Sequence, residues 1–203
     1  MRVGVLASGA GTNLQAILDT VHGRDGVEVV AVGSDKPDAQ ALERGRAAGV
    51  DTAVFPAEEF EGDRPARDGA MAAWLAEHGV GLVVLAGYMQ LLGANFLGRF
   101  PQRVINVHPA LLPAFPGIRA VEQAIDYGVK TFGVTVHFVD EGVDSGPIIL
   151  QRAVELPGAS EAAEVRAALR PLEHELLCEA VRLIARDAVR FDPDHPRRVL
   201  IAS

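Results

Sequence analysis

Residues 103–117, RVINVHPALLPAFPG, constrain the fold most, because they fix the point where one buried strand must end. The run that begins at Val104 is apolar and β-branched, which is typical of a buried strand. Pro109 lacks an N–H group and cannot continue a central strand. Asn106 and His108 are two residues apart, so both side chains project from one face of the strand near its end. Because ligands of open α/β sheets bind beyond the carboxyl ends of the strands, we predict a polar site here.

The chemistry of this pair has two interpretations. An amide that donates a hydrogen bond, beside an imidazole that carries a proton, is suited to polarising a carbonyl group and moving protons. The alternative is that Asn106 and His108 only cap the loop that follows the strand. Taken alone, this segment leaves both interpretations open.

Short apolar runs alternate with helical patterns along the rest of the chain, which predicts an α/β fold. We expect a single-domain, Rossmann-like fold with a mostly parallel twisted sheet, helices on both faces and an antiparallel strand in the C-terminal part. The other expected strands are residues 2–7, 27–33, 52–55, 81–86, 130–139 and 148–156. The connection between the last two is too short for a crossover helix, so these two strands should be antiparallel.

The helical patterns also give expectations about domain limits. A long helix is expected over residues 160–190, with Ser160 as its N-cap and a kink or an interruption at Pro171. A shorter helix is expected around residues 70–77. We expect residues 1–191 to form one domain and residues 192–203 to form a loosely attached tail.

Composition excludes several classes of partner. The formal net charge of −8 argues against nonspecific binding to nucleic acid or to an anionic membrane. The chain has no apolar run of membrane-spanning length and enters a strand without a signal peptide, so we expect a cytoplasmic protein. We expect it to be either a monomer or a homodimer. Cys178 is the single cysteine and is expected to be a buried thiol. The histidines and aspartates lack the spacing of metal ligands, so we expect no metal.

A glycine loop, SGAGTN at residues 8–13, joins the first expected strand to a helix. This layout aims backbone N–H groups and a helix dipole at an anion, and it favours phosphate binding over a tight turn that merely needs glycine. The loop is not a Walker A motif, and Leu14 occupies the place of the third glycine in a dinucleotide fingerprint. Asp35 stands near the position of a ribose-binding acid, so NAD binding remains an alternative, as does a plain turn residue.

Three further segments each have two interpretations. Residues 87–92 carry large apolar side chains that either close the core or form one wall of a flat apolar pocket. Arg64 and Arg67 lie in a polar stretch and are expected to be surface charges, although one of them could meet a substrate carboxylate. The expected strand at residues 130–139 carries Thr135 and His137 on its polar face, which indicates a solvent-facing sheet edge rather than a cleft wall.

The polar candidates for chemistry are Asn106, His108, Thr135, His137, Asp140 and Asp144. No serine lies in a Gly-x-Ser-x-Gly elbow, and no other side-chain nucleophile is evident. An amide, an imidazole and a carboxylate suit direct attack of one bound substrate on another, because the protein then needs only to position them, stabilise an oxyanion and relay a proton.

Motifs along nearly the whole chain resemble those of the folate-dependent formyltransferase family, and in particular the glycinamide ribonucleotide formyltransferases. The motifs are SGAGTNLQA at residues 8–16, SDKPDA at 34–39, LAGYMQLL at 85–92, INVHPALLPAFPG at 105–117 and GVTVHFVDEGVDSGPIILQ at 133–151, with Glu173 in the last helix. The NxHPxLLP element and the later Asp-Ser-Gly-Pro are shared by the wider superfamily, whereas the first loop narrows the acceptor to glycinamide ribonucleotide.

The resemblance implies a role for each candidate residue. Asn106 would donate to the formyl oxygen, His108 would act as the acid–base group, and Asp144 would hold the imidazole and favour its protonated form. The residues implied to bind the acceptor are Gly11, Thr12, Asn13, Asn106 and Glu173. The residues implied to bind 10-formyltetrahydrofolate, the co-substrate, are Arg64, Met89, Gln90, Leu91, Leu92, Val139, Asp140 and Asp144. The N-terminal half would thus hold the acceptor's phosphate and the C-terminal half the folate.

The sequence also departs from the family pattern. Gln90 stands where an arginine is common, Arg170 where some members have glutamine, and Ala110 and Ala114 where Ser and Lys are frequent. None of these positions belongs to the catalytic set, so the departures bear on folate affinity rather than on the chemistry.

Overall fold

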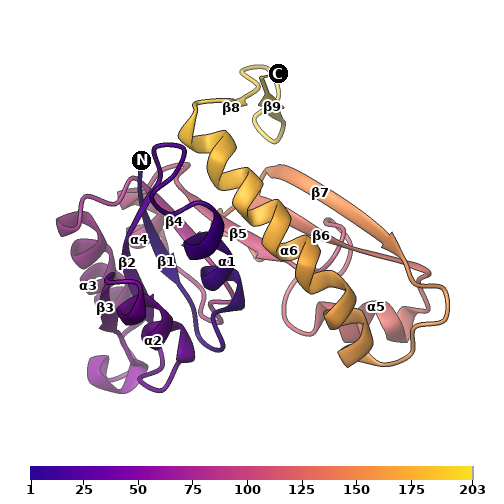
Figure 1. The fold of residues 1–203 in the computed structure, drawn as a ribbon, viewed down its shortest axis with the longest axis horizontal. Helices are drawn as coiled ribbons and strands as arrows, with labels where there is room; N and C mark the ends of the chain where they lie inside the picture. The colour runs from indigo at the N-terminus through magenta and orange to yellow at the C-terminus, as the bar shows by residue number, and fades with distance from the viewer. Residues whose placement is uncertain (203) are drawn as a thin grey trace. The chain divides into compact units, whose positions relative to one another are not determined.

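The computed structural model describes residues 1–202, which form two compact units, Met1–Asn106 and a second unit that begins at Val107 (Figure 1). The division falls within β5 (Val104–His108), which ends at His108, directly before Pro109, as the sequence predicts. The expected α/β class with mostly parallel strands and one antiparallel strand is confirmed. No helix among residues 1–202 has the length and apolar character needed to cross a bilayer.

The first unit is a doubly wound parallel sheet with the strand order β3-β2-β1-β4-β5. Its other strands are β1 (Arg2–Leu6), β2 (Glu28–Ser34), β3 (Asp51–Val54) and β4 (Leu82–Leu85). Its helices are α1 (Thr12–Thr20), α2 (Gln40–Ala47), the 3-10 helix η1 (Ala57–Phe60), α3 (Arg64–Glu77) and α4 (Ala94–Arg99). The chain reverses its winding direction between β1 and β4, and this switch point is where open α/β sheets hold ligands.

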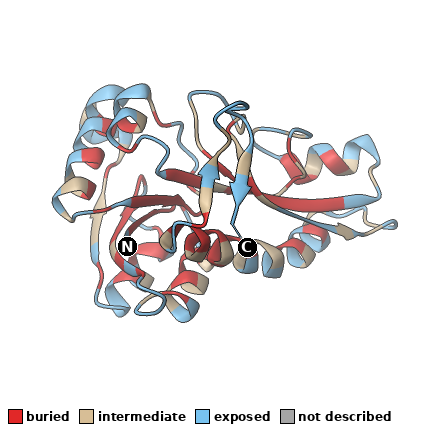
Figure 2. Cartoon of the chain, turned by 90° about the horizontal axis from the view of Figure 1, so that it is seen from above, coloured by how far each residue is buried: buried red, intermediate tan, exposed pale blue. Residues whose placement is uncertain are grey.

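Helices cover both faces of this sheet. A Cβ atom added to Gly33 of β2 would lie 3.7 Å from Trp74 of α3, whereas one added to Gly45 of α2 would lie 3.1 Å from Val32. Because consecutive strand residues point to opposite faces, α3 and α2 must lie on opposite sides of β2. Figure 2 shows the result, with strands largely buried and the outward surfaces of helices exposed.

The second unit is built on an antiparallel pair, β6 (Thr131–Phe138) and β7 (Ile148–Glu155). The helices α5 (Ala120–Tyr127) and α6 (Ala162–Ala185) pack against each other, and α6 packs on both strands. A small hairpin of β8 (Val189–Phe191) and β9 (Val199–Ile201) follows α6. Cys178 of α6 is buried, as expected.

The expectation that residues 130–139 form a solvent-facing edge is wrong. Every residue of β6 after Thr131 is buried, including Thr135 and His137, whereas β7 carries the exposed positions. The polar face is covered by the proline-rich turn, because Thr135 donates to the Ala110 carbonyl and accepts from the Leu112 N–H. Alternation along a strand cannot indicate that a distant segment covers its polar face.

Two helices differ from their predicted limits. α6 spans Ala162–Ala185, inside the predicted limits of 160–190, and Glu161 rather than Ser160 is at its N-cap. Pro171 does not interrupt it, because the buried leucines around that residue hold the helix on β6 and β7. α3 begins at Arg64, six residues before its predicted start, with Asp63 accepting the Ala66 N–H as an N-cap and Pro65 in the first turn. An Asp followed by Pro in the first turn is a helix-start signal that could have been read from the sequence.

Candidate active site

The carboxyl ends of β1, β4 and β5 bring three predicted elements to one edge of the first unit. The N–H of Ser8, after β1, donates to the Gly87 carbonyl at 3.1 Å, and the Ser8 hydroxyl accepts the Met89 N–H at 2.9 Å. Asn106 lies in register with Leu85 at the end of β4. The glycine loop, the apolar loop at residues 87–92 and Asn106 therefore share the edge at the switch point.

The glycine loop presents the N-terminus of α1 at this edge. Gly11 caps the helix with φ +68°, and a Cβ atom there would lie 2.8 Å from the Cα of Ala41, so only glycine fits. The first intrahelical bond runs from the Gln15 N–H to the Gly11 carbonyl. The N–H groups of residues 12–14 precede that bond, and the first turn carries no acidic side chain. The positive end of the helix dipole thus suits an anion.

Asp35 joins two loops through both of its carboxylate oxygens. Its Oδ1 accepts from the Ser8 hydroxyl and its Oδ2 accepts from Gln90 Nε2 at 3.1 Å. The residue is buried, with 8% of its surface exposed. Both oxygens thus take part in the network between the loops, which favours the interpretation of Asp35 as a turn residue over the NAD alternative.

The expectation that Arg67 is a surface charge is wrong. Its side chain is 4% exposed and lies 3.0 Å from the buried carboxylate of Asp68, because the early start of α3 turns both residues inward. Arg67 also donates to Gln90 at 3.3 Å, and Asp68 accepts the Gly93 N–H at 2.7 Å. This ion pair therefore holds both ends of the segment 90–93, whereas Arg64 is exposed.

The apolar loop has exposed and buried members. Met89 and Leu91 are 63% and 57% exposed, whereas Tyr88 and Leu92 are buried. Burial raises the pKa of Tyr88 above its ordinary range, so its hydroxyl stays protonated. Two exposed apolar side chains on a loop held by Ser8 and Asp35 form a fixed apolar surface that a flat ring could contact.

The second unit brings His108 and Asp144 together. Nδ1 of His108 lies 3.3 Å from Oδ2 of Asp144, and its Nε2 lies 2.8 Å from the Phe115 carbonyl oxygen. Each ring nitrogen of this buried imidazole thus faces an oxygen atom, which fixes the orientation of the ring. Oδ2 of Asp144 also accepts the Gly117 N–H at 2.7 Å.

His137 is a second imidazole partner of Asp144 that sequence reasoning left outside the catalytic set. Its Nε2 lies 3.6 Å from Asp144 Oδ1, and its Nδ1 lies 2.8 Å from the Phe138 carbonyl. Burial alone would raise the pKa of Asp144, but hydrogen bonds from His137 and the Gly117 N–H, with the charge of His108, lower it from 3.8 to about 2. The carboxylate is therefore ionised at neutral pH. The sequence signal that could have identified His137 was its position on the same polar face of β6 as Thr135.

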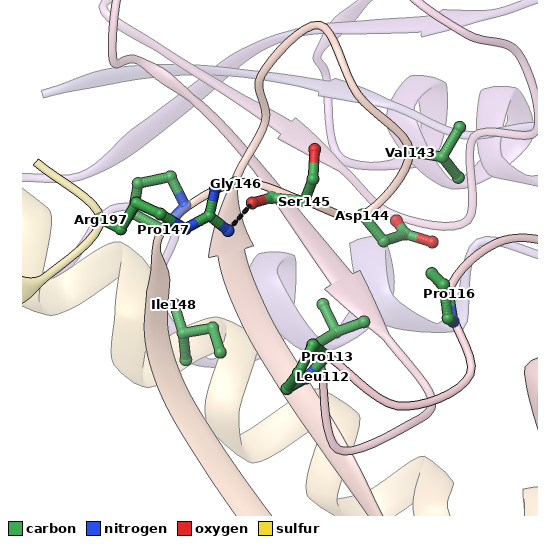
Figure 3. Close-up of a pocket in the computed structure, with 10 residues that line it drawn as sticks. All are labelled: Leu112, Pro113, Pro116, Val143, Asp144, Ser145, Gly146, Pro147, Ile148 and Arg197. Atoms are coloured by element: carbon green, nitrogen blue, oxygen red, sulfur yellow. Dashed lines mark hydrogen bonds between the residues drawn. The ribbon is translucent and has the colours of Figure 1, made fainter.

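A cavity of about 410 Å³ adjoins Asp144 within the second unit (Figure 3). Its lining residues are Leu112, Pro113, Pro116, Val143, Asp144, Ser145, Gly146, Pro147, Ile148 and Arg197. Val139 and Asp140 begin the loop that carries Asp144, and Asp140 accepts from the Gly142 N–H and the Ser145 hydroxyl. Glu173 is half-buried on α6.

A comparison with known protein families identifies the class to which the chain belongs. The model of the family described as Formyl transferase matches residues 1–181. The chain therefore belongs to the formyl transferase family.

Within this family, the chain is similar to enzymes that are named for one acceptor, phosphoribosylglycinamide. The phosphoribosylglycinamide formyltransferase of Bacillus subtilis (strain 168) is 40% identical over 172 residues, which cover 84% of this chain and 88% of that protein. The enzyme of the same name from Mycobacterium tuberculosis (strain H37Rv) is 42% identical over 191 residues, covering 93% and 86%. The crystal structure of glycinamide ribonucleotide transformylase 1 from Symbiobacterium toebii has a TM-score of 0.95 and 47% identity, covering 100% of this chain and 94% of that one.

Proposed function

We propose that this protein transfers the formyl group of 10-formyltetrahydrofolate to the amine of 5′-phosphoribosylglycinamide. The products are 5′-phosphoribosyl-N-formylglycinamide and tetrahydrofolate, a step of purine biosynthesis. The observation that carries the proposal is the contact of His108 with Asp144, in a chain of the formyl transferase family that is similar to enzymes named for this acceptor. We further propose that it acts on small molecules as a monomer or homodimer.

The acceptor's phosphate binds at the N-terminus of α1. Backbone N–H groups of Gly11, Thr12 and Asn13 contact its oxygens, supported by the helix dipole and by the absence of an acidic side chain in the first turn. Glu173 receives the amine end of the acceptor, because a carboxylate attracts the ammonium form and accepts from the neutral amine.

The folate ring system binds against the fixed apolar loop. The exposed side chains of Met89 and Leu91 fit an apolar heterocycle, and the remaining residues of the folate set are Arg64, Gln90, Leu92, Val139, Asp140 and Asp144. The amide of Gln90 already joins Asp35 to Arg67, so Gln90 contacts the folate only through the hydrogen-bonding capacity that these two bonds leave. The bound folate supplies an activated formyl carbon.

The chain's own polar groups act on that carbon. The amine nitrogen forms a bond to the formyl carbon, the bond from this carbon to folate N10 breaks, and the proton lost by the amine replaces the formyl group on N10. Asn106 donates a hydrogen bond to the formyl oxygen as negative charge develops there. His108 moves the proton, and ionised Asp144 holds the imidazole in place and balances its charge.

The purified protein, mixed with both substrates, tests this proposal through the loss of 10-formyltetrahydrofolate. We expect turnover that requires the acceptor and that drops when its phosphate is removed. Turnover with a different amine, and not with phosphoribosylglycinamide, would keep the chemistry but refute the acceptor. Thermal stabilisation by NAD without stabilisation by a folate analogue would refute the whole assignment.

A further inference from the structure

The C-terminal hairpin, residues 188–202, has a folded structure of its own. β8 pairs with β9, and the Ala202 N–H donates to the Ala188 carbonyl at 2.8 Å. The turn between the strands is fixed by Asp192, whose Oδ1 accepts the N–H of Asp194 at 2.9 Å. The family model matches only residues 1–181, so this hairpin lies outside the matched region.

The hairpin contacts the Asp144 loop, residues 139–147, near both of its ends. The ring of Phe191 lies 4.8 Å, between centroids, from that of Phe138, the residue that precedes the loop. Nη2 of Arg197 donates to the carbonyl oxygen of Ser145, the residue that follows Asp144, at 2.5 Å. Figure 3 shows the guanidinium directed at this carbonyl across the rim of the cavity.

The loop needs such contacts because little packs beneath it. Residues 143–148 form one wall of the 410 Å³ cavity, and the opposite wall is the proline-rich turn at residues 112–116. Side chains on one side of this space lose the dispersion contacts that a filled core would supply. The orientation of the loop therefore depends on polar contacts rather than on close packing.

The backbone conformation of Asp144 is a second reason why the loop needs polar contacts to hold its orientation. Asp144 has φ +49°, in the left-handed region that side-chain-bearing residues rarely adopt. The neck of the loop is fixed, since the Phe138 N–H donates to the Pro147 carbonyl at 2.8 Å and Gly146 lies against the Phe138 carbonyl too closely for any Cβ. Between this neck and Asp144, the Ser145 carbonyl is the group that Arg197 holds.

We infer that Arg197 is a positioning residue for the reaction. By holding the Ser145 carbonyl, it keeps the carboxylate of Asp144, which lines the cavity, aimed at His108. Its effect on turnover rests on the proposed function, whereas its effect on the orientation of Asp144 does not. The C-terminal hairpin thus acts on His108 and Asp144 through the Ser145 carbonyl.

The test compares Arg197→Met with Arg197→Lys and Arg190→Met. Methionine keeps the apolar stem but removes the donors, whereas lysine retains a charged donor. Arg190 is an exposed arginine of β8 in the same hairpin and, within residues 1–202, makes no hydrogen bond to the loop, which makes it the matched control. Because Arg197 is exposed, we expect all three variants to keep the wild-type melting temperature; Arg197→Gln replaces the methionine variant should that one fail to fold.

Two readouts are needed. In Arg197→Met we expect kcat to fall roughly tenfold with little change in the acceptor KM, since misorientation of a catalytic group affects the reacting geometry rather than binding. The imidazole ¹⁵N resonances of His108 and His137, recorded without substrates, should shift in the same variant. Arg197→Lys should retain most of the wild-type kcat and most of the wild-type resonance positions. Arg190→Met should match wild type in both measurements.

Equal behaviour of Arg197→Met and Arg190→Met in the ring resonances would overturn the inference, and so would an unshifted spectrum with reduced turnover. Absence of formyl transfer by the wild-type protein would refute the proposed function only. The ring resonances would then still decide whether Arg197 orients Asp144.

Discussion

The carboxylate of Asp144 lies 3.3 Å from the imidazole of His108, and the two residues come from a loop and a strand end that are distant in the sequence. The same carboxylate accepts the Gly117 N–H and faces His137 at 3.6 Å. Asp144 thus links its loop to three other segments of the second unit, which are the end of β5, the proline-rich turn and β6. A carboxylate with several partners should affect the stability of the folded state at low pH as well as the chemistry.

Asp144 should make the folded state sensitive to acid. Its pKa is about 2 when folded, and a carboxyl of this type has a pKa of about 3.9 when unfolded, so ionisation favours the folded state above about pH 4. The shift corresponds to about 2.5 kcal/mol. This stabilisation should be fully present at neutral pH and lost as the pH falls from about 4 to 2. Denaturant unfolding of wild type and Asp144→Asn should therefore show a gap at pH 6 that closes toward pH 2. A gap independent of pH would contradict the assignment of the charge.

Asn106 should contribute to turnover more than to binding. If its amide donates to the developing oxyanion, Asn106→Ala should lower kcat by about 10²–10³-fold with a smaller change in the acceptor KM. Asn106→Asp keeps the size of the side chain but removes the donor, and it should be at least as damaging. Steady-state kinetics of the two variants decide the matter, since an active aspartate variant would rule out a donor role.

The parts that could be predicted from the sequence depend on local physics. Pro109 fixed the end of β5, and the glycine loop indicated the exposed N-terminus of α1, because both signals act within a few residues. The approach of Asp144 to His108 depends on tertiary folding, and its role came only from the resemblance to a family.

The two incorrect predictions concern burial that depends on a partner residue rather than on local sequence. Arg67 is charged but buried, because Asp68 neutralises it and the N-cap at Asp63 starts α3 early. β6 carries a polar face that a distant turn covers through Thr135. In each case the compensating partner determines the burial, and amphipathic pattern alone does not identify that partner.

The first turn of α1 should bind the acceptor's phosphate in the ground state and the transition state alike. Thr12→Ala removes a hydroxyl donor from this turn, so it should raise the acceptor KM while leaving kcat nearly unchanged. An acceptor analogue without the phosphate provides the control, because its kinetics should be the same with wild type and variant. A fall in kcat at unchanged KM would place Thr12 in the chemistry instead of in phosphate binding.

The Arg67–Asp68 pair should be important for stability because both side chains are almost fully buried, at 4% and 0% exposure. Arg67→Met leaves the Asp68 carboxylate buried without its counter-ion, so we expect the free energy of unfolding to fall by about 3–5 kcal/mol. Arg64→Met, at an exposed position of the same helix, should change it by less than about 0.5 kcal/mol. The double variant Arg67→Met, Asp68→Asn removes the uncompensated charge but keeps an acceptor for the Gly93 N–H, so it should recover part of the loss. Urea unfolding of the three variants measures these differences, and a cost for Arg67→Met no larger than that for Arg64→Met would show that the pair does not stabilise the loop at residues 90–93.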